Sequence, residues 1–498
     1  MRLPSLQMTA SVIVAILSAS PAIAAQQPPA SLAMTGSSIA PSTDTSSTPP
    51  SATTEVETLR GEVEALRAIV DRQSRLLDEL DRRLQSVTPT SAQPAAIVST
   101  AVAAPPAEPA PVATQQPADD SLEKKVDELT KRWGKLRLTG DIQIRYEGFF
   151  NQGLDLPVDV AARNRLRYRV RAQLAGDIGK NFDWGIRLAS GSFNNPISPQ
   201  QTATDFYNRK PIGIDRAFLH FDTKTDGANL ELWGGKFEAP WKRTAVTFDE
   251  DLQPEGLAQS IGVDVSKDGL LRKVEFTAWQ LPYRERAIGA DAVLFGGQFL
   301  TDWKLSDDWG LTLAGTFHDF EQVNVIPVAV AAPSGVVNAG FEYGTTNTVV
   351  INPFTNLPEY RSDYRVIDAI FELRNSGPGK DGRWPIVLRA DWIHNTSAFN
   401  NQKDGGQLEA IIGRRQEQGD WQFDYGFWKV EREAFPSVFM DSEMLIQTNS
   451  VTHSARARYM LRKQVEFAWR YFAHRRLTTT APENRWTNHL QFDVQYRF

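Results

Sequence analysis

The chain ends on ten residues that alternate between polar and apolar, His489-Leu490-Gln491-Phe492-Asp493-Val494-Gln495-Tyr496-Arg497-Phe498. Successive side chains of a β-strand point to opposite faces, so this stretch predicts a strand with one polar and one apolar face. The same period of two recurs in the segments 136–146, 421–427 and 465–471. Residues 135–498 are therefore predicted to consist of amphipathic strands.

The connections between these segments alternate in length. Short connections include residues 177–181, 223–227, 266–269, 418–420 and 462–463, and long ones include 193–211, 237–256, 321–363 and 433–447. Tight turns at one end and long loops at the other are typical of an up-and-down membrane barrel. A large secreted β-sandwich or propeller, the alternative, gives no reason for this alternation. The predicted fold class is an all-β transmembrane barrel of about 16 antiparallel strands.

Composition excludes several classes of protein. The 498 residues carry a net charge of −6, which is mild and of the wrong sign for a general nucleic-acid binder. The chain has no cysteine, which excludes disulfides, thiolate metal sites and cysteine nucleophiles. Aromatic residues make up 10%, and this enrichment suits the girdles that a barrel places at the two membrane interfaces.

The first residues predict an export signal. Arg2 precedes an apolar run, residues 12–17, and small residues follow up to Ala22-Ile23-Ala24. This order is typical of a secretory signal over residues 1–24, which is removed after export. The alternative is an N-terminal membrane anchor, but the apolar run is short for a bilayer core of about 30 Å.

Residues 25–134 are predicted to be helical and disordered in turn. Residues 25–54 and 89–120 are rich in Pro, Ser, Thr and Ala and are expected to be disordered tethers. Residues 55–88 repeat apolar positions in the three-four spacing of a coiled coil, and residues 121–134 predict a short helix. Val and Leu in the seam favour a dimeric coiled coil, whereas the apolar Ile69 and Leu76 beside the seam suit a trimeric one. The alternative is that this helix does not self-associate and packs on its own domain. The residues predicted to self-associate are Val56, Leu59, Val63, Leu66, Val70, Leu77, Leu80 and Leu84.

Four stretches of the strand region carry a resemblance to a known family: residues 162–169, 213–219, 233–237 and 248–252. They resemble the putative-porin family of Gram-negative outer membranes and, more distantly, the phosphate-selective porins. The resemblance implies a trimer of 16-stranded pores surrounded by outer-membrane lipid, with the coiled coil in the periplasm. Phe498, preceded by alternating apolar residues, resembles the signal that barrel-assembly machinery reads.

One predicted strand carries arginine at every second position: Arg163, Arg165, Arg167, Arg169 and Arg171. All five side chains project from one face, and facing lipid each would cost roughly 2–4 kcal/mol near the bilayer midplane. They are therefore expected to line the pore, where a ladder of positive charge attracts anions. The alternative, which can hold at the same time, is that they pair with acids of neighbouring strands.

The long connection 237–256 falls between the fifth and sixth predicted strands. In the family that this chain resembles, the loop at this place folds inward and narrows the channel. Here an inward fold would set acids against the arginine wall across water; the alternative is an extracellular cap. The residues predicted to form this constriction are Lys242, Arg243, Asp249, Glu250, Asp251 and Glu255.

The sequence predicts a channel and no enzyme. Its six histidines show no metal-ligand spacing, and no nucleophile elbow or phosphate-binding loop occurs, so neither metal nor cofactor is expected. The predicted function is a water-filled pore for passive diffusion of small hydrophilic solutes or ions. Two alternatives stay open: a structural tether that reaches peptidoglycan through the coiled coil, and an anion- or phosphate-selective channel, which the acids of 249–255 count against.

Overall fold

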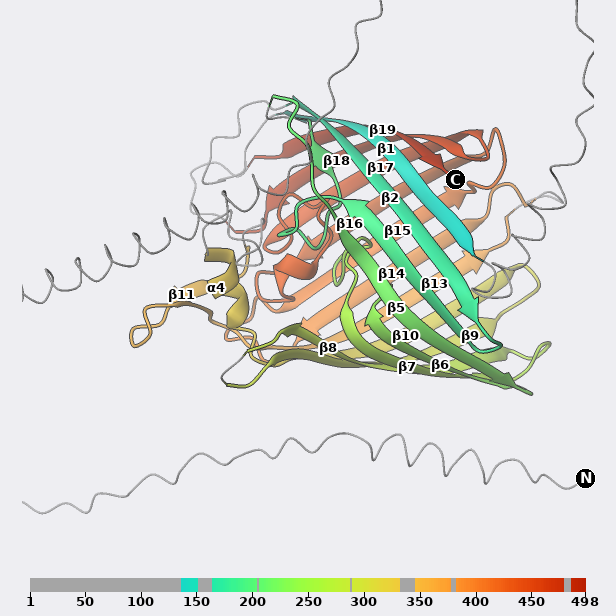
Figure 1. The fold of residues 1–498 in the computed structure, drawn as a ribbon, viewed down its shortest axis with the longest axis horizontal. Coiled ribbons are helices and arrows are strands. Elements are labelled where there is room, and N and C mark those ends of the chain that lie inside the picture. Colours follow the sequence, from blue (N-terminus) through green and yellow to red (C-terminus); the bar gives the residue numbers. More distant parts are fainter. Residues whose placement is uncertain are drawn as a thin grey trace, which may run out of the picture. The chain divides into compact units, whose positions relative to one another are not determined.

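The computed structural model describes residues 136–150, 164–203, 206–286, 289–331, 345–377, 382–478 and 485–498. In this part of the chain a 17-stranded sheet closes on itself (Figure 1), and one member, β4 (Gln201–Thr202), is a two-residue piece of a connection. The wall therefore has 16 antiparallel strands, as predicted. They are β1 (Arg137–Phe150), β2 (Asn164–Ile178), β3 (Phe182–Ser190), β5 (Ile212–Thr225), β6 (Ala228–Lys236), β7 (Glu255–Asp264), β8 (Leu271–Arg284), β9 (Ala292–Lys304), β10 (Trp309–Phe320), β13 (Tyr364–Asn375), β14 (Ile386–Asn395), β15 (Asp404–Gly413), β16 (Trp421–Val430), β17 (Ser450–Arg462), β18 (Val465–Arg476) and β19 (Thr487–Arg497).

The first and last strands close the barrel. In their antiparallel register Asp141 lies opposite Arg497. Just beyond, the Gly140 N–H donates to the Phe498 carbonyl at 2.9 Å, and the Phe498 N–H donates to the Gly140 carbonyl at 3.1 Å. A Cβ at Gly140 would collide with the Phe498 ring, so the glycine makes room for that ring at the seam. A closed sheet has no unpaired edge.

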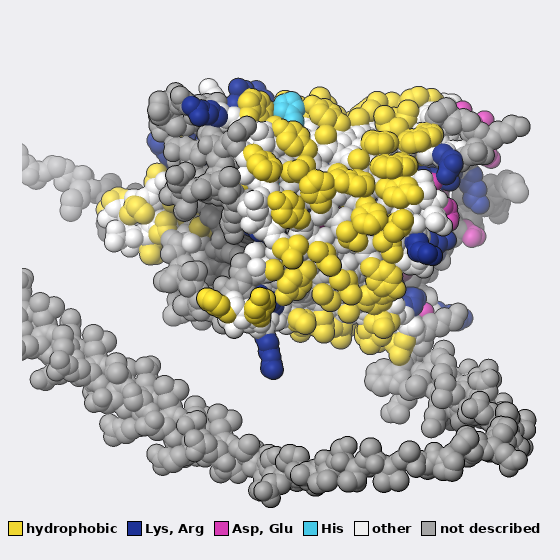
Figure 2. Space-filling view, turned by 90° about the horizontal axis from the view of Figure 1, so that it is seen from above, with side chains coloured by type: hydrophobic (Ala, Val, Ile, Leu, Met, Phe, Trp, Pro, Cys, Tyr) yellow, Lys and Arg dark blue, Asp and Glu magenta, His cyan; other side chains and the backbone are white. Residues whose placement is uncertain are grey.

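The period of two in the sequence separates the outside of the wall from the inside. On β1, Ile142 and Ile144 are 43% and 53% exposed, whereas Asp141 and Gln143, which alternate with them, are buried. Figure 2 shows hydrophobic side chains gathered over the outer surface of the barrel. The polar face of each strand therefore points inward, the inverse of a water-soluble sheet.

The connections alternate as predicted, with bounds that differ by a few residues. Short turns include 179–181, 226–227 and 463–464, and long loops include 191–211, 237–254, 321–363 and 431–449. The loop 321–363 contains α4 (Val325–Ala331), β11 (Val349–Ile351) and β12 (Pro358–Tyr360), and the loop 431–449 contains the 3-10 turn η1 (Ser437–Phe439).

Among the described residues, no helix has both the length and the apolar character needed to cross a membrane. The signal, the tethers, the coiled-coil residues and the short helix predicted for residues 1–134 all lie outside the described residues.

Candidate functional site

The arginine ladder lies on the inner face of β2. Leu166 and Val170 on the same strand are 50% and 38% exposed on the outer wall, whereas Arg167 is buried. Arg165, Arg167, Arg169 and Arg171 therefore project inward, because they share the face opposite to these two apolar residues. Arg163 lies outside the described residues.

Each of the four arginines meets an acid of β1. Arg165 and Arg167 form ion pairs with Glu147. Arg169 and Arg171 form ion pairs with Asp141, at 2.9 and 2.6 Å. These pairs follow from the register of β1 and β2, which sets Asp141 opposite Arg171 and Glu147 opposite Arg165. The arginines thus hold the wall together, and the ladder is not an uncompensated positive stripe.

The loop 237–254 lies inside the barrel. Its ends are joined by a hydrogen bond from the Phe237 N–H to the Pro254 carbonyl, 3.0 Å. Between them, Trp241 stacks on Trp279 of β8 with ring centroids 4.1 Å apart. The Thr244 hydroxyl donates to Asp391 of β14. A loop that touches inner residues of β8 and β14, besides those of β2 and β13 described next, must cross the lumen.

Four of the six residues predicted for the constriction anchor this loop. Asp251 pairs with Arg171 at 2.8 Å, and Lys242 pairs with Glu372 of β13 at 2.9 Å. Arg243 donates to two carbonyl groups of the loop itself, those of Glu250 and Leu252, both at 3.1 Å. Asp249 accepts the Ser442 N–H at 2.6 Å, and Ser442 belongs to the other long loop, 431–449.

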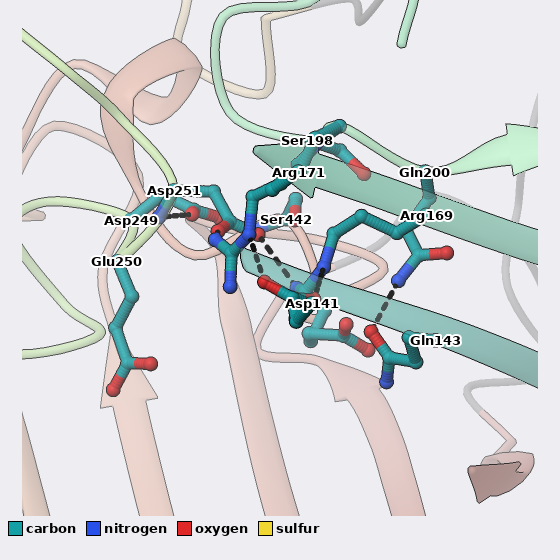
Figure 3. A network of polar contacts seen from close by, with 12 residues as sticks. Asp141, Gln143, Arg169, Arg171, Ser198, Gln200, Asp249, Glu250, Asp251 and Ser442 are labelled. Atoms are coloured by element: carbon teal, nitrogen blue, oxygen red, sulfur yellow. Dashed lines mark hydrogen bonds and ion pairs between the residues drawn. The ribbon is translucent and has the colours of Figure 1, made fainter. Parts of the chain in front are cut away.

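Glu250 behaves differently from its neighbours. Its side chain points away from the network that joins Asp251 to the wall (Figure 3) and is exposed. Among the described residues its carboxylate makes no hydrogen bond or ion pair, but it interacts electrostatically with Arg389 of β14 and Arg456 of β17. Glu250 is thus an exposed acid of this loop whose carboxylate is not held by an ion pair among the described residues, whereas the exposed Glu238 pairs with Arg216 at 2.7 Å.

The prediction that Glu255 belongs to the loop is wrong. Glu255 is the first residue of β7, because the ladder with β6 begins two pairs earlier than the apolar pattern suggested. It shares a face with exposed Leu257 on the outside and pairs with Lys236 at 2.8 Å.

The loop 431–449 also enters the barrel, a placement that the sequence pattern did not predict. Phe248 of the loop 237–254 packs edge-on against its Phe435, with centroids 5.3 Å apart. The Asp249 N–H donates to the Phe439 carbonyl at 2.8 Å, so the two loops are also joined through their backbones. The signal was its buried apolar content, which is unusual for an exposed loop: Ala434, Phe435, Val438, Phe439, Met440, Met444 and Ile446.

Acids of the two loops meet at this contact. Burial, together with the carboxylates of Asp441 and Asp251, raises the pKa of Asp249 well above its usual range. Burial also raises the pKa of Asp441, to about 6, although Arg470 acts in the opposite direction. For Glu443 burial acts upward too, but Arg145 and Arg470 outweigh it and hold the pKa well below its usual range. Glu443 is thus ionised on the arginine wall, whereas the Asp249–Asp441 pair favours protons.

The histidines occupy wall positions. His318, His474 and His489 are buried, and His220 and His394 lie 2.9 and 2.8 Å from the carboxylates of Asp183 and Asp404. Within the described ranges no three His, Asp or Glu side chains are grouped so that they could hold a metal ion.

Comparisons with solved structures return barrel proteins at low identity. OprB from Pseudomonas putida, in a high-pH structure, is 9% identical, with 76% of this chain and 97% of OprB covered and a TM-score of 0.46. OmpF from Salmonella typhi, in complex with daunomycin, is 10% identical, with 73% and 98% covered and a TM-score of 0.43. A triple mutant of the Rhodopseudomonas blastica porin is 11% identical, with 73% and 100% covered and a TM-score of 0.37.

No curated protein matches the chain. A family model does: it covers β2 to β10 and α4, which includes the whole of the arginine strand β2 and the whole of the loop 237–254. The resemblance drawn from the sequence is confirmed there, since residues 151–349 match the family described as putative porin.

Proposed function

We propose that this chain forms an outer-membrane channel through which small hydrophilic solutes or ions diffuse passively. The observation that carries the proposal is a barrel wall that is apolar outside and charged inside, together with a loop that crosses the lumen and is anchored to the inner face of the wall. The match to the putative porin family supports a channel in the outer membrane of a Gram-negative bacterium.

The loop 237–254 is the constriction of this channel. Its anchors are of two kinds, a stacked Trp241 and ion pairs at both Lys242 and Asp251, so it is held from opposite sides of the lumen. Pairing neutralises most charges of the wall, and the exposed Glu250 is left to act on passing ions opposite Arg389 and Arg456. A fixed charge in a narrow aqueous passage sets the preference between cations and anions. We infer weak ion selectivity and no phosphate-specific site, because acids stand among the arginines.

Within this proposal the protein is a homotrimer in the outer membrane, inserted by barrel-assembly machinery that reads Phe498, with residues 55–88 as a periplasmic coiled coil. Val and Leu in the seam of that segment support self-association. Size-exclusion chromatography with light scattering, on the full chain and on a chain lacking residues 55–88, measures the oligomeric state and the contribution of the coiled coil. A monomeric full chain would refute the trimer.

Recordings from planar bilayers test the channel itself. Purified full-length protein should give stepwise conductance increases that scale with salt concentration and need no energy source. An Arg171→Gln, Asp251→Asn double variant, which unties the loop from β2, should give larger or noisier steps. Protein that inserts as a heat-modifiable barrel and yet gives no steps would overturn the proposal.

A further inference from the structure

The strands β16 to β19 carry an aromatic outer face that changes character at the long-loop end of the barrel. Tyr425 of β16 and Tyr471 of β18 are exposed on this face, on either side of Ala455 of β17. The Tyr425 hydroxyl lies 2.8 Å from Nδ1 of His453, and the Tyr471 hydroxyl donates to Asn488 at 2.7 Å. His453 and Asn488 lie one row nearer the long loops, so both hydroxyls point that way, as tyrosines do at a membrane interface.

Two cations occupy the next row toward the loops. Lys429 of β16 and Arg475 of β18 both lie opposite Val451 of β17. Two strand spacings of about 4.8 Å therefore place their backbones about 10 Å apart. Both side chains project outward, because each residue lies an even number of positions from the exposed tyrosine of its own strand. Long side chains at this separation can converge on one group above Val451.

Neither cation has an acidic partner among the described residues. Lys429 is exposed and, within that part of the chain, makes no hydrogen bond or ion pair. The Arg475 guanidinium lies over the Trp486 ring, 4.8 Å from its centroid, and its Nε has no hydrogen-bond partner in the described ranges. Glu431, two positions after Lys429, is engaged elsewhere, since its carboxylate accepts the Asp404 N–H at 3.0 Å.

The strands β10 and β13 show how a cation at this end of the wall can be compensated. Arg365 of β13 lies on the outer face near the long loops and pairs at 3.1 Å with Asp319, its register partner on β10. Between Lys429 and Arg475 the corresponding place holds the apolar Val451. Two positive charges thus remain uncompensated at the surface of the proposed membrane, where they attract anionic lipid head groups.

The leaflet determines which head group these cations meet. The long loops of an outer-membrane barrel are extracellular, so Lys429 and Arg475 lie at the outer leaflet. In a Gram-negative outer membrane this leaflet consists of a glycolipid with several acyl chains and with phosphomonoester groups on its sugars. A phosphomonoester carries about 1.5 to 2 negative charges at pH 7, which matches two cations. The phosphodiester of a glycerophospholipid such as phosphatidylglycerol carries only one.

We propose that Lys429 and Arg475 together bind one phosphate of a phosphorylated, multiply acylated glycolipid of the outer leaflet. Its acyl chains lie on the aromatic face below the cations, where Phe423 and Trp469 are exposed on either side of Ala457. The inference rests on the proposed membrane location, and it concerns the outer wall, not the lumen.

Native mass spectrometry of the full-length protein in detergent tests this with diphosphorylated lipid A as the probe. The wild type should bind one lipid A per chain, and neither phosphatidylglycerol nor inorganic phosphate at equal concentration should displace it. Lys429→Gln and Arg475→Gln should each weaken binding about fivefold, and the double variant about 25-fold, the effects of one and two interfacial charges. Lys429→Arg keeps the charge and should bind like the wild type.

Arg365→Gln is the matched control, because it removes a cation from the outer face at the same end that is already paired with Asp319. It should leave lipid A binding unchanged. Three results would overturn the proposal: displacement of lipid A by phosphatidylglycerol or by inorganic phosphate, unchanged binding in the double variant, or a changed oligomeric state in that variant, which would identify this face as a contact between copies.

Conductance separates this inference from the proposed function. The double variant should conduct like the wild type, because both side chains lie on the outer wall. Weakened lipid A binding with intact conductance supports the glycolipid site. A wild type that conducts but does not bind lipid A refutes the glycolipid site alone, and a wild type that binds lipid A but does not conduct refutes the channel alone.

Discussion

Replacing Glu250 with Gln removes one charge from the lumen and leaves the anchors of the loop in place. The Glu250 carboxylate makes no hydrogen bond or ion pair within the described residues, so its loss should not release the loop. Asp251 stays on Arg171, and Lys242 stays on Glu372. The change therefore acts on passing ions rather than on the fold.

The size of the effect follows from Coulomb's law. A monovalent ion that passes about 5 Å from a unit charge in water interacts with it by about 0.8 kcal/mol, which is about a fourfold change in local concentration. At 0.1 M salt the Debye length of about 10 Å reduces this to about 0.5 kcal/mol, or about 2.3-fold. Glu250 raises the local concentration of cations by this factor and lowers that of anions by the same factor. The two effects multiply, so Glu250→Gln should lower the cation-to-anion permeability ratio about fivefold. At 1 M salt, where the Debye length is about 3 Å, the change should shrink to less than about twofold.

Reversal potentials across a tenfold salt gradient measure this ratio, and Glu255→Gln is the matched control. Glu255 carries the same charge but lies on the outer face, paired with Lys236. An unchanged ratio in Glu250→Gln at 0.1 M salt, or an equal shift in Glu255→Gln, would refute the role of Glu250 in ion preference.

Three more outcomes are expected from the interior. Because the pKa of Asp441 is raised to about 6, the contact between the loops 237–254 and 431–449 is most stable below about pH 3.8 and weakens as pH rises through about 6. Hydrogen exchange at the Ser442 amide, corrected for the intrinsic exchange rate, should therefore increase from pH 5 to 8. The variant Asp441→Asn should flatten this pH profile. Trp241→Ala removes a buried ring stacked on Trp279 and should weaken docking of the loop by about 3–5 kcal/mol, seen as larger single-channel steps; steps of wild-type size would contradict this. Arg171→Gln leaves Asp251 with a single arginine contact at 3.7 Å and should shift the reversal potential toward cations, and an unshifted value would mean that ions do not pass this pair.

The strands were predictable because a membrane imposes a strict contrast between the two faces of each strand. Leu136, Ile142 and Ile144 lie outside as the pattern indicated, and the loop between the fifth and sixth strands is where the count placed it. Counting could not give the end of that loop, since the ladder between β6 and β7 begins at Lys236 and Glu255, a pair of charges that the apolar pattern does not include.

The interior was less predictable because it depends on which residues meet across the barrel. The pairing of Glu147 with Arg165 follows from the register of β1 and β2, and the two acids on the inner face of β1, Asp141 and Glu147, were a visible sign of it. The contact of Phe248 with Phe435 joins two loops far apart in the chain, and no local period encodes it. Only the excess of apolar residues in 431–449 signalled that this loop needed a place to pack.

The seam between β1 and β19 sets a condition on assembly. The pair that spans it, Arg145 and Asp493, is separated by 348 positions along the chain, whereas most other strands meet neighbours a hairpin away. The pairing of β1 with β19, which closes the barrel, thus joins the residues farthest apart in the chain. We expect it to form late and at the largest entropic cost. Until it forms, two opposite edges stay open to strand exchange with other chains, so a defect in either terminal strand should act as a kinetic trap and as a route to aggregation.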